Sequence, residues 1–259
     1  MNLGSVLGAI VQRDWAMMKR YIVNTVSGLI SIYIVFFLIF LGFKSFSAYA
    51  TAGALQGTIE GATIGFFVWT FTLMAFQDLA WSLVVEAQAG TLEQLYLTPS
   101  GFRWVCACTM MSSFVLNFIP IVILLVAMMA TTGQWMNLDF ISLIPLLLIT
   151  IFGGYGFGFA LGGLALIFKR IQALFQIFQF VFIAFLIVPS RVPWAKFLPL
   201  SMGNSLIYDV MVYGTRLWEL PLGDILTAVA VGIFYLAVGI FIFSHCENAA
   251  KSRGLLGHY

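Results

Sequence analysis

The sequence predicts an all-α membrane protein with six transmembrane helices, and its composition carries most of that prediction. Of its 259 residues, 62% are hydrophobic and only 8% are charged, whereas soluble proteins carry about 25% charged residues. A soluble globule of this size would lack the polar side chains for its surface. A disordered chain would be poor in apolar residues and rich in charge. The class that remains is a multi-pass membrane protein.

The uncharged stretches between the charges predict where the spans lie. A membrane helix needs about 20 apolar residues, because each residue rises 1.5 Å and the hydrocarbon core is about 30 Å thick. The second stretch reaches this length only if it includes Asp78, an acid near the end of the span. We therefore expect one transmembrane domain over residues 1–259. Its predicted spans cover residues 21–43, 61–85, 104–131, 140–168, 171–188 and 224–246.

The distribution of Lys and Arg predicts the orientation. Six spans put both termini on one side, and the segments on that side hold eight of the twelve basic residues. Since basic residues are enriched in cytoplasmic loops, we expect both termini, including a tail over 247–259, to be cytoplasmic. The first span has 23 uncharged residues, more than the 7–15 of a signal peptide, so it is read as a retained helix.

Residues 3–20 predict an amphipathic helix at the cytoplasmic membrane surface. Apolar side chains recur along it, and a tryptophan and several basic residues suit the headgroup region and anionic lipid. The alternative interpretation is a topology signal only. The charged and aromatic residues concerned are Arg13, Asp14, Trp15, Lys19 and Arg20.

The segment between the second and third spans, residues 86–98, predicts a short capped helix over roughly 91–98. Gly90 ends the preceding helix, and Pro99 stops the new one because proline cannot continue the backbone ladder. Thr91 and Gln94 have the spacing of a capping box, in which each side chain bonds the other residue's backbone N–H. A simple connector would need neither these caps nor this length. The expected apolar face consists of Leu92, Leu95 and Tyr96.

Two further stretches indicate packing rather than chemistry. In the fourth span, Gly154, Gly158 and Gly162 recur at every fourth residue, and such a stripe lets another helix approach closely in the membrane. Residues 189–221 combine four prolines with aromatic and apolar residues. Short helices that dip into the outer leaflet would explain both features, and an interfacial aromatic belt is the alternative.

The residue inventory excludes several kinds of chemistry. Both histidines lie near the C-terminus, so no metal or haem site is expected inside the spans. The cysteines, Cys106, Cys108 and Cys246, have no framework spacing and suit apolar packing. No glycine is followed by lysine, so the P-loop that binds ATP is missing. We therefore expect no enzyme activity and no cofactor bound by this chain.

The sequence resembles the membrane subunit of an ABC-2 type exporter, a family that includes polysaccharide, teichoic-acid and daunorubicin-type efflux permeases. The resemblance covers most of the chain and rests on three stretches. The first is the family's signature between spans two and three, and the others precede span one and follow span five. The matching residues are Glu86, Gly90, Thr91, Leu92, Glu93, Gln94, Leu95, Thr98 and Pro99; Arg13, Asp14, Lys19, Arg20 and Tyr21; and Pro193, Trp194, Pro199, Asn204 and Arg216.

The resemblance implies a dimer of two such permease subunits in the cell membrane of a prokaryote, with ATP and Mg²⁺ on a separate cytoplasmic P-loop ATPase. Residues 86–98 would be the coupling helix that docks on that ATPase, beside an interface helix over 3–20. Re-entrant helices over 189–221, with Pro189 at their start, would close the exit. The chain departs from the family at Ser205, where proline commonly follows the asparagine.

Several functions remain open from the sequence. Because 16% of the residues are aromatic and few polar groups could line a path, we expect a hydrophobic or amphiphilic substrate such as a drug or lipid. Export of a polysaccharide or lipid-linked glycan is an alternative, since sugars also stack on aromatic faces. From other classes, an ion-coupled carrier could use Asp78, and a structural or insertase-like protein would need residues 86–98 only as a loop.

Overall fold

The computed structural model describes residues 3–47, 53–88, 91, 94, 97–98, 101–168, 171–187 and 193–252. These residues form α-helices and one short 3₁₀-helix, and no strand occurs within these ranges, which confirms the all-α class. The elements in chain order are α1 (Leu3–Arg20), α2 (Ile22–Ser47), α3 (Gly53–Gln88), α5 (Phe102–Thr132), α6 (Phe140–Ile167), α7 (Gln172–Ile187), η1 (Pro193–Phe197), α8 (Ser201–Tyr213) and α9 (Leu222–Ser252).

Five helices in the described part of the chain are long and apolar enough to cross a membrane, so the protein is a multi-pass membrane protein. They contain five of the six predicted spans. The sixth, predicted at 171–188, corresponds to α7, which spans 16 of the described residues. At 1.5 Å per residue α7 extends about 24 Å, short of the roughly 30 Å hydrocarbon core. The count of six spans therefore stays a prediction.

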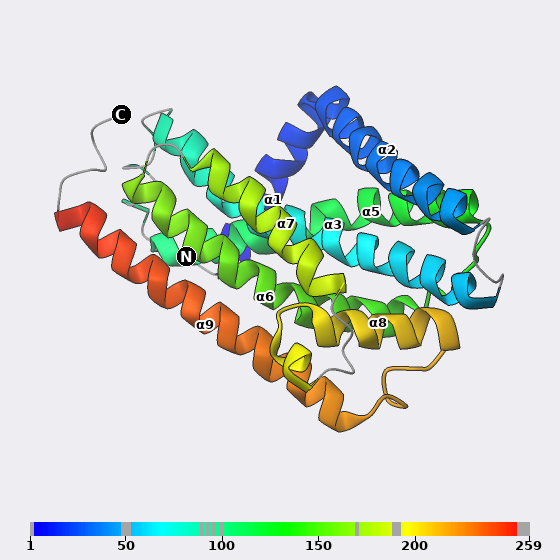
Figure 1. Ribbon diagram of the computed structural model, residues 1–259. Helices are drawn as coiled ribbons and strands as arrows, with labels where there is room; N and C mark the ends of the chain where they lie inside the picture. The colour runs from blue at the N-terminus through cyan, green and yellow to red at the C-terminus, as the bar shows by residue number, and fades with distance from the viewer. Residues whose placement is uncertain are drawn as a thin grey trace.

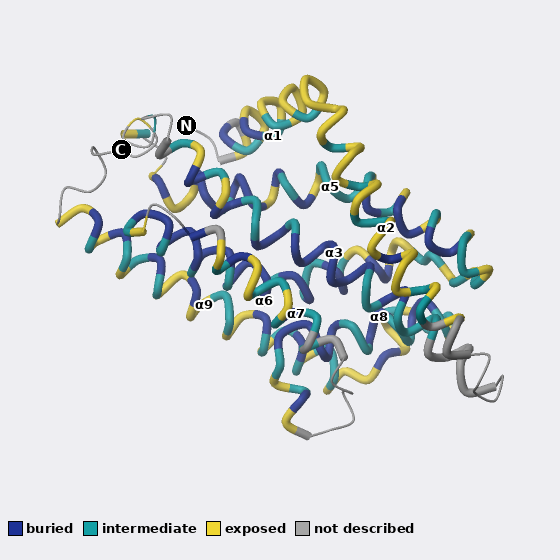
Figure 2. The backbone as a smooth tube through the Cα atoms, turned by 45° about the horizontal axis from the view of Figure 1, so that its top comes forward, coloured by how far each residue is buried: buried dark blue, intermediate teal, exposed yellow. Residues whose placement is uncertain are grey.

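The helices form an elongated bundle with α6 near its centre (Figure 1). Helix α6 packs most extensively against α9 and then against α3, while α5 lies between α3 and α1. Helix α2 lies at the periphery and is largely exposed (Figure 2). One end of the bundle holds α1, the last turns of α3 and α9 and the first turn of α5. We call it the α1 end. The opposite end, where α8 lies, is the α8 end.

Glycines bring α6 into backbone contact with both of its main neighbours. A Cβ atom at Gly156 would lie 2.2 Å from the Tyr235 carbonyl oxygen of α9, and one at Gly239 would lie 2.0 Å from the Gly156 carbonyl oxygen. The stripe noted in the sequence faces α3: a Cβ at Gly154 would lie 2.8 Å from Thr72, and one at Gly158 3.1 Å from the Phe76 carbonyl oxygen. The third member, Gly162, lies against Leu79 and Leu83.

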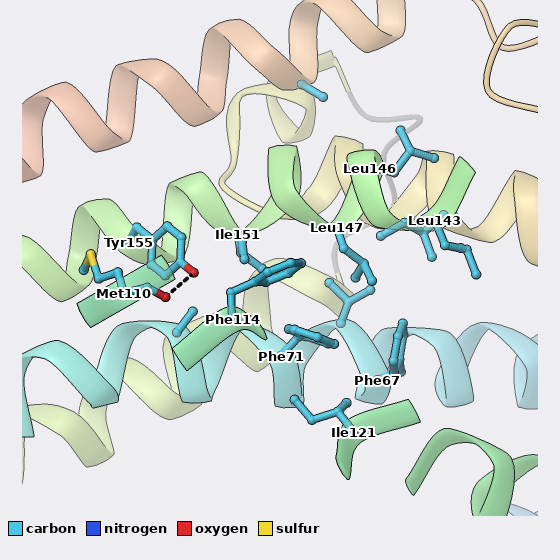
Figure 3. Close-up of a cluster of buried hydrophobic side chains, with 14 of the residues drawn as sticks. Phe67, Phe71, Met110, Phe114, Ile121, Leu143, Leu146, Leu147, Ile151 and Tyr155 are labelled. Carbon is cyan, nitrogen blue, oxygen red and sulfur yellow. Dashed lines mark hydrogen bonds between the residues drawn. The ribbon is translucent and has the colours of Figure 1, made fainter. Parts of the chain in front are cut away.

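Large apolar side chains fill the space between α3, α5 and α6 (Figure 3). Phe71 and Phe114 have ring centroids 5.5 Å apart. Among these side chains, the Tyr155 hydroxyl of α6 donates a hydrogen bond to the Met110 carbonyl oxygen of α5 at 3.0 Å. The bond supplies the partner that a buried phenol requires, and it joins α5 to α6.

Two stretches in the second half of the chain show more detail than the sequence predicted. The stretch predicted to be re-entrant forms η1 and α8, and α8 buries Leu206, Ile207 and Val210. Helix α9 continues to Ser252, into the predicted tail, and Glu247 and Lys251 form an ion pair one turn apart near its end. Such pairs stabilise a helix end.

Candidate functional site

The segment between α3 and α5 follows the last turn of α3 at the α1 end, and two of its described residues are exposed. Gln94 is exposed, and the Leu97 side chain is 82% exposed. Gly101, with a φ of 84°, precedes the first turn of α5. Of the residues predicted to form the coupling helix, Glu86, Thr91 and Thr98 are described. Those outside the described residues are Gly90, Leu92, Glu93, Leu95, Tyr96 and Pro99.

Thr91 is fixed to the end of α3. Its backbone N–H donates to the Glu86 carbonyl oxygen at 3.0 Å. Its hydroxyl donates to Glu86, whose carboxylate and carbonyl oxygens both lie within hydrogen-bonding distance. In a capping box the Thr91 hydroxyl oxygen accepts a hydrogen bond from the Gln94 backbone N–H. Its donation to Glu86 is compatible with that bond, so the capping box stays a prediction.

Helix α1 contacts both helices that flank this segment. Arg13 Nη1 lies 3.7 Å from a carboxylate oxygen of Glu86 on α3, and Arg13 Nε lies 3.0 Å from Asp14 Oδ1. The second oxygen of Asp14 accepts a hydrogen bond from the Ser112 hydroxyl of α5 at 2.7 Å. An apolar cluster joins α1 to α5 as well. It contains Val6, Ile10, Val105 and Cys108.

The far end of α1 carries the predicted interfacial residues. Trp15 is exposed, and the Lys19 ammonium lies 5.0 Å from the centre of its ring. Arg20 lies 5.8 Å from the ring of Tyr21. These contacts keep the basic groups next to aromatic rings on the outer face of α1, an arrangement that suits a membrane surface.

An ion-pair cluster fixes the other flank of the segment. Arg103 at the start of α5 lies 3.0 Å from Glu247 of α9, and Lys251 lies 2.6 Å from the second oxygen of the same carboxylate. The Glu247 side chain is only 5% exposed. Sequence reasoning missed this cluster because Glu247 was assigned to a solvated tail. The sequence signal that could have indicated the cluster is the four-residue spacing of Glu247 and Lys251, which suits an ion pair on a helix.

The residues predicted at the exit lie around η1 and α8 rather than in one cluster. Pro193 begins η1 and Trp194 is exposed. Pro199 lies against Gly153 of α6. A Cβ atom added to this glycine would lie 3.1 Å from the Pro199 Cβ. Asn204 lies in the first turn of α8. Arg216 stacks 5.4 Å from the ring of Trp218, and Pro189 is outside the described residues.

Asp78 borders a cavity of about 450 Å³ between α3 and α7. Its carboxylate accepts a hydrogen bond from the Asn117 amide of α5 at 3.0 Å. Sequence reasoning singled out Asp78 but not its neighbours, which come from helices distant in the chain. We call this the Asp78 cavity; the described residues that line it are Gln77, Asp78, Trp81, Phe175 and Gln176.

The candidate site therefore has two parts: a segment with exposed residues Gln94 and Leu97 between two fixed flanks, and a separate cavity with one acid. Within the described ranges, no three His, Cys, Asp or Glu side chains gather closely enough to hold a metal ion. The chain matches no known family model and no curated protein sequence.

Proposed function

We propose that the protein is the membrane-spanning permease subunit of an ATP-driven exporter of ABC-2 type. It would work with a separate cytoplasmic P-loop ATPase and with a second permease subunit, identical or related. The observation that carries the proposal is that Gln94 and Leu97 are exposed, while the helices on both flanks of their segment are tied by ion pairs to other helices of the bundle.

The flanking contacts support a role in transmitting movement. On one side Glu86 holds Thr91 and pairs with Arg13. On the other side Arg103 pairs with Glu247. A partner that displaces the segment would therefore act on α1, α3, α5 and α9 together. Coupling requires contacts that differ between two states of the complex, and ion pairs at the flanks of a docking segment can provide them.

The exposed Leu97 supports docking of a protein partner. An apolar side chain exposed at a charged end of the bundle has no favourable environment in water. Burial of a leucine contributes about 1.5–3 kcal/mol. We infer that Leu97 enters a hydrophobic cleft of the ATPase together with the predicted apolar face of the segment.

The expected substrate is a hydrophobic or amphiphilic molecule, a drug or lipid-like compound, moved outward across the membrane. Many large hydrophobic side chains are exposed on the spans. Export of a glycan by the same mechanism is the alternative. ATP and Mg²⁺ would bind to the partner ATPase.

Substitution of Leu97 by Asp tests the docking. A charge at this position would be buried unpaired in the complex, which is unfavourable, so we expect L97D to lose co-purification with a P-loop ATPase and its ATP hydrolysis. Membrane insertion should not change. L222D is the matched control, because Leu222 is 76% exposed and lies at the α8 end. An L97D complex that retains the ATPase would contradict the proposal.

A second candidate function is an ion-coupled carrier that uses Asp78. The position of this acid beside a cavity favours it, because acids inside spans often mark ion pathways. The exporter would require ATP for transport, whereas the carrier would require an ion gradient. Purified protein that transports along an ion gradient without any ATPase would favour the carrier, whereas strict dependence on ATP would favour the exporter.

A further inference from the structure

We propose that the Asp78 cavity binds an amphiphilic organic cation. The transport of that cation rests on the proposed function, but its binding does not and can be measured on the permease alone. The inference concerns the chemical class of the ligand, and it follows from the side chains that the fold brings together between α3 and α7.

The cavity has the size and lining of a small-molecule site. Its volume of about 450 Å³ falls within the roughly 300–1,000 Å³ typical of ligand pockets. The rings of Trp81 and Phe175 are 6.2 Å apart and nearly perpendicular, so they offer two differently oriented aromatic surfaces. Phe175 is buried, while Trp81 is 47% exposed. Aromatic faces attract cations within about 6 Å of the ring centre.

The carboxylate supplies the charge that selects a cation. An acid inside a span is costly unless it is paired. Asp78 has a polar partner in Asn117, and no Lys or Arg of the described residues forms an ion pair with it. Asp14 on α1 also acts electrostatically on Asp78. Asp14 already pairs with Arg13, so Asp78 is the acid that makes the cavity attractive to positive charge.

The composition of the lining favours an organic cation over a metal ion. A hard metal cation takes about six or more oxygen ligands. The described lining offers one carboxylate and the side-chain amides of Gln77 and Gln176, with the rest aromatic. A cation with apolar substituents would use the carboxylate, the amides and the rings at once.

The second large cavity provides a contrast within the same molecule. It has a volume of about 350 Å³, lies between α5, α6 and α9, and has an almost entirely apolar lining with Arg103 at its edge. An organic cation would find a like charge there. Binding of a cationic probe should therefore depend on Asp78 and not on Arg103.

Binding of tetraphenylphosphonium to the purified full-length permease in nanodiscs, without an ATPase, tests the inference. We expect Asp78→Asn to weaken binding at least about tenfold, the equivalent of 1.4 kcal/mol, and to leave binding of neutral triphenylphosphine oxide unchanged. Glu60→Gln removes a charge from the same helix away from the cavity and should have no effect. Equal affinity of wild type and Asp78→Asn for the cation would overturn the inference.

A second variant keeps the test decisive if Asp78→Asn does not fold. Trp81→Ala retains the carboxylate and removes one ring, and we expect about threefold to tenfold weaker binding of the cation. Displacement of the probe by equimolar Na⁺ would instead identify an inorganic ion site and would also overturn the inference. Loss of the ATPase partner with intact Asp78-dependent binding would contradict only the proposed function.

Discussion

Glu247 pairs with two cations that come from different places in the chain, Arg103 at the start of α5 and Lys251 one turn along α9. Its carboxylate is almost fully buried, whereas both cations are about half exposed. If the ion pairs break, water can therefore solvate the two cations, but it cannot solvate the buried carboxylate. The acid is the member of the cluster on which the connection between α5 and α9 depends.

This difference predicts unequal effects of neutralising the members. Glu247→Gln should lower the free energy of unfolding by about 1.5–3 kcal/mol, the value for hydrogen bonds to charged groups. Lys251→Gln should cost at most about 1 kcal/mol, because Arg103 still pairs with the acid and exposed pairs contribute little. Thermal unfolding of both variants in the same detergent measures the difference. Equal destabilisation would show that Glu247 has no special role.

At the scale of single residues, the sequence predicted some contacts and not others. Asp78 could be singled out because an acid within an apolar stretch is visible in the sequence. The ion pairs of Arg13 with Glu86 and of Arg103 with Glu247 could not, because each joins helices far apart in the chain. The hydrogen bonds from Thr91 to Glu86 were not predicted either, because the local spacing pointed only to Gln94.

At the scale of helices, glycines decide how closely α6 can approach its neighbours. The stripe of Gly154, Gly158 and Gly162 was visible as a pattern, but the pattern does not name the partner helix, which is α3. The contact between Gly156 and Gly239 was not predicted, because its two members lie on different helices and form no repeat. Without a hydrophobic driving force between helices in lipid, close backbone contact is a main source of association.

Gly156→Ala should therefore disturb the contact between α6 and α9. Its Cβ would lie 2.2 Å from the Tyr235 carbonyl oxygen, and a backbone atom cannot move aside alone, so we expect a cost of about 1–3 kcal/mol or more. Gly28→Ala in α2 is the control, because nothing lies within 4 Å of its added Cβ. It should leave stability unchanged or raise it by up to about 1 kcal/mol. Folded yield and thermal unfolding distinguish the two, and similar losses would contradict the close contact.

At the scale of the whole molecule, the direction of successive helices constrains the topology. Helix α6 ends at the α1 end, and α9 begins at the α8 end, so the chain returns along the bundle through α7 (Figure 1). Composition and charge predicted the helical class and five of the spans. Composition and charge did not determine whether α7 is a span, because its described part is shorter than a full crossing.

Whether α7 crosses the membrane can be determined from the side of the membrane on which residues before and after it lie. Trp135 follows three spans and is 73% exposed between α5 and α6, while Ser252 is the last residue of α9. If α7 crosses, the two positions lie on opposite sides; if it does not, they lie on the same side. Since the basic residues predict a cytoplasmic N-terminus, Trp135→Cys should react with an impermeant thiol reagent in intact cells. Ser252→Cys should react only after permeabilisation.

The parent for this labelling carries Cys246→Ala, because Cys246 is partly accessible while Cys106 and Cys108 are buried. Gly4→Cys in α1 reports the side of the N-terminal helix and should behave like Ser252→Cys. Reaction of both Trp135→Cys and Ser252→Cys in intact cells would mean five spans. Reaction of Ser252→Cys alone would reverse the orientation, and it would place the segment over residues 91–98 outside the cell, where no cytoplasmic ATPase could bind it.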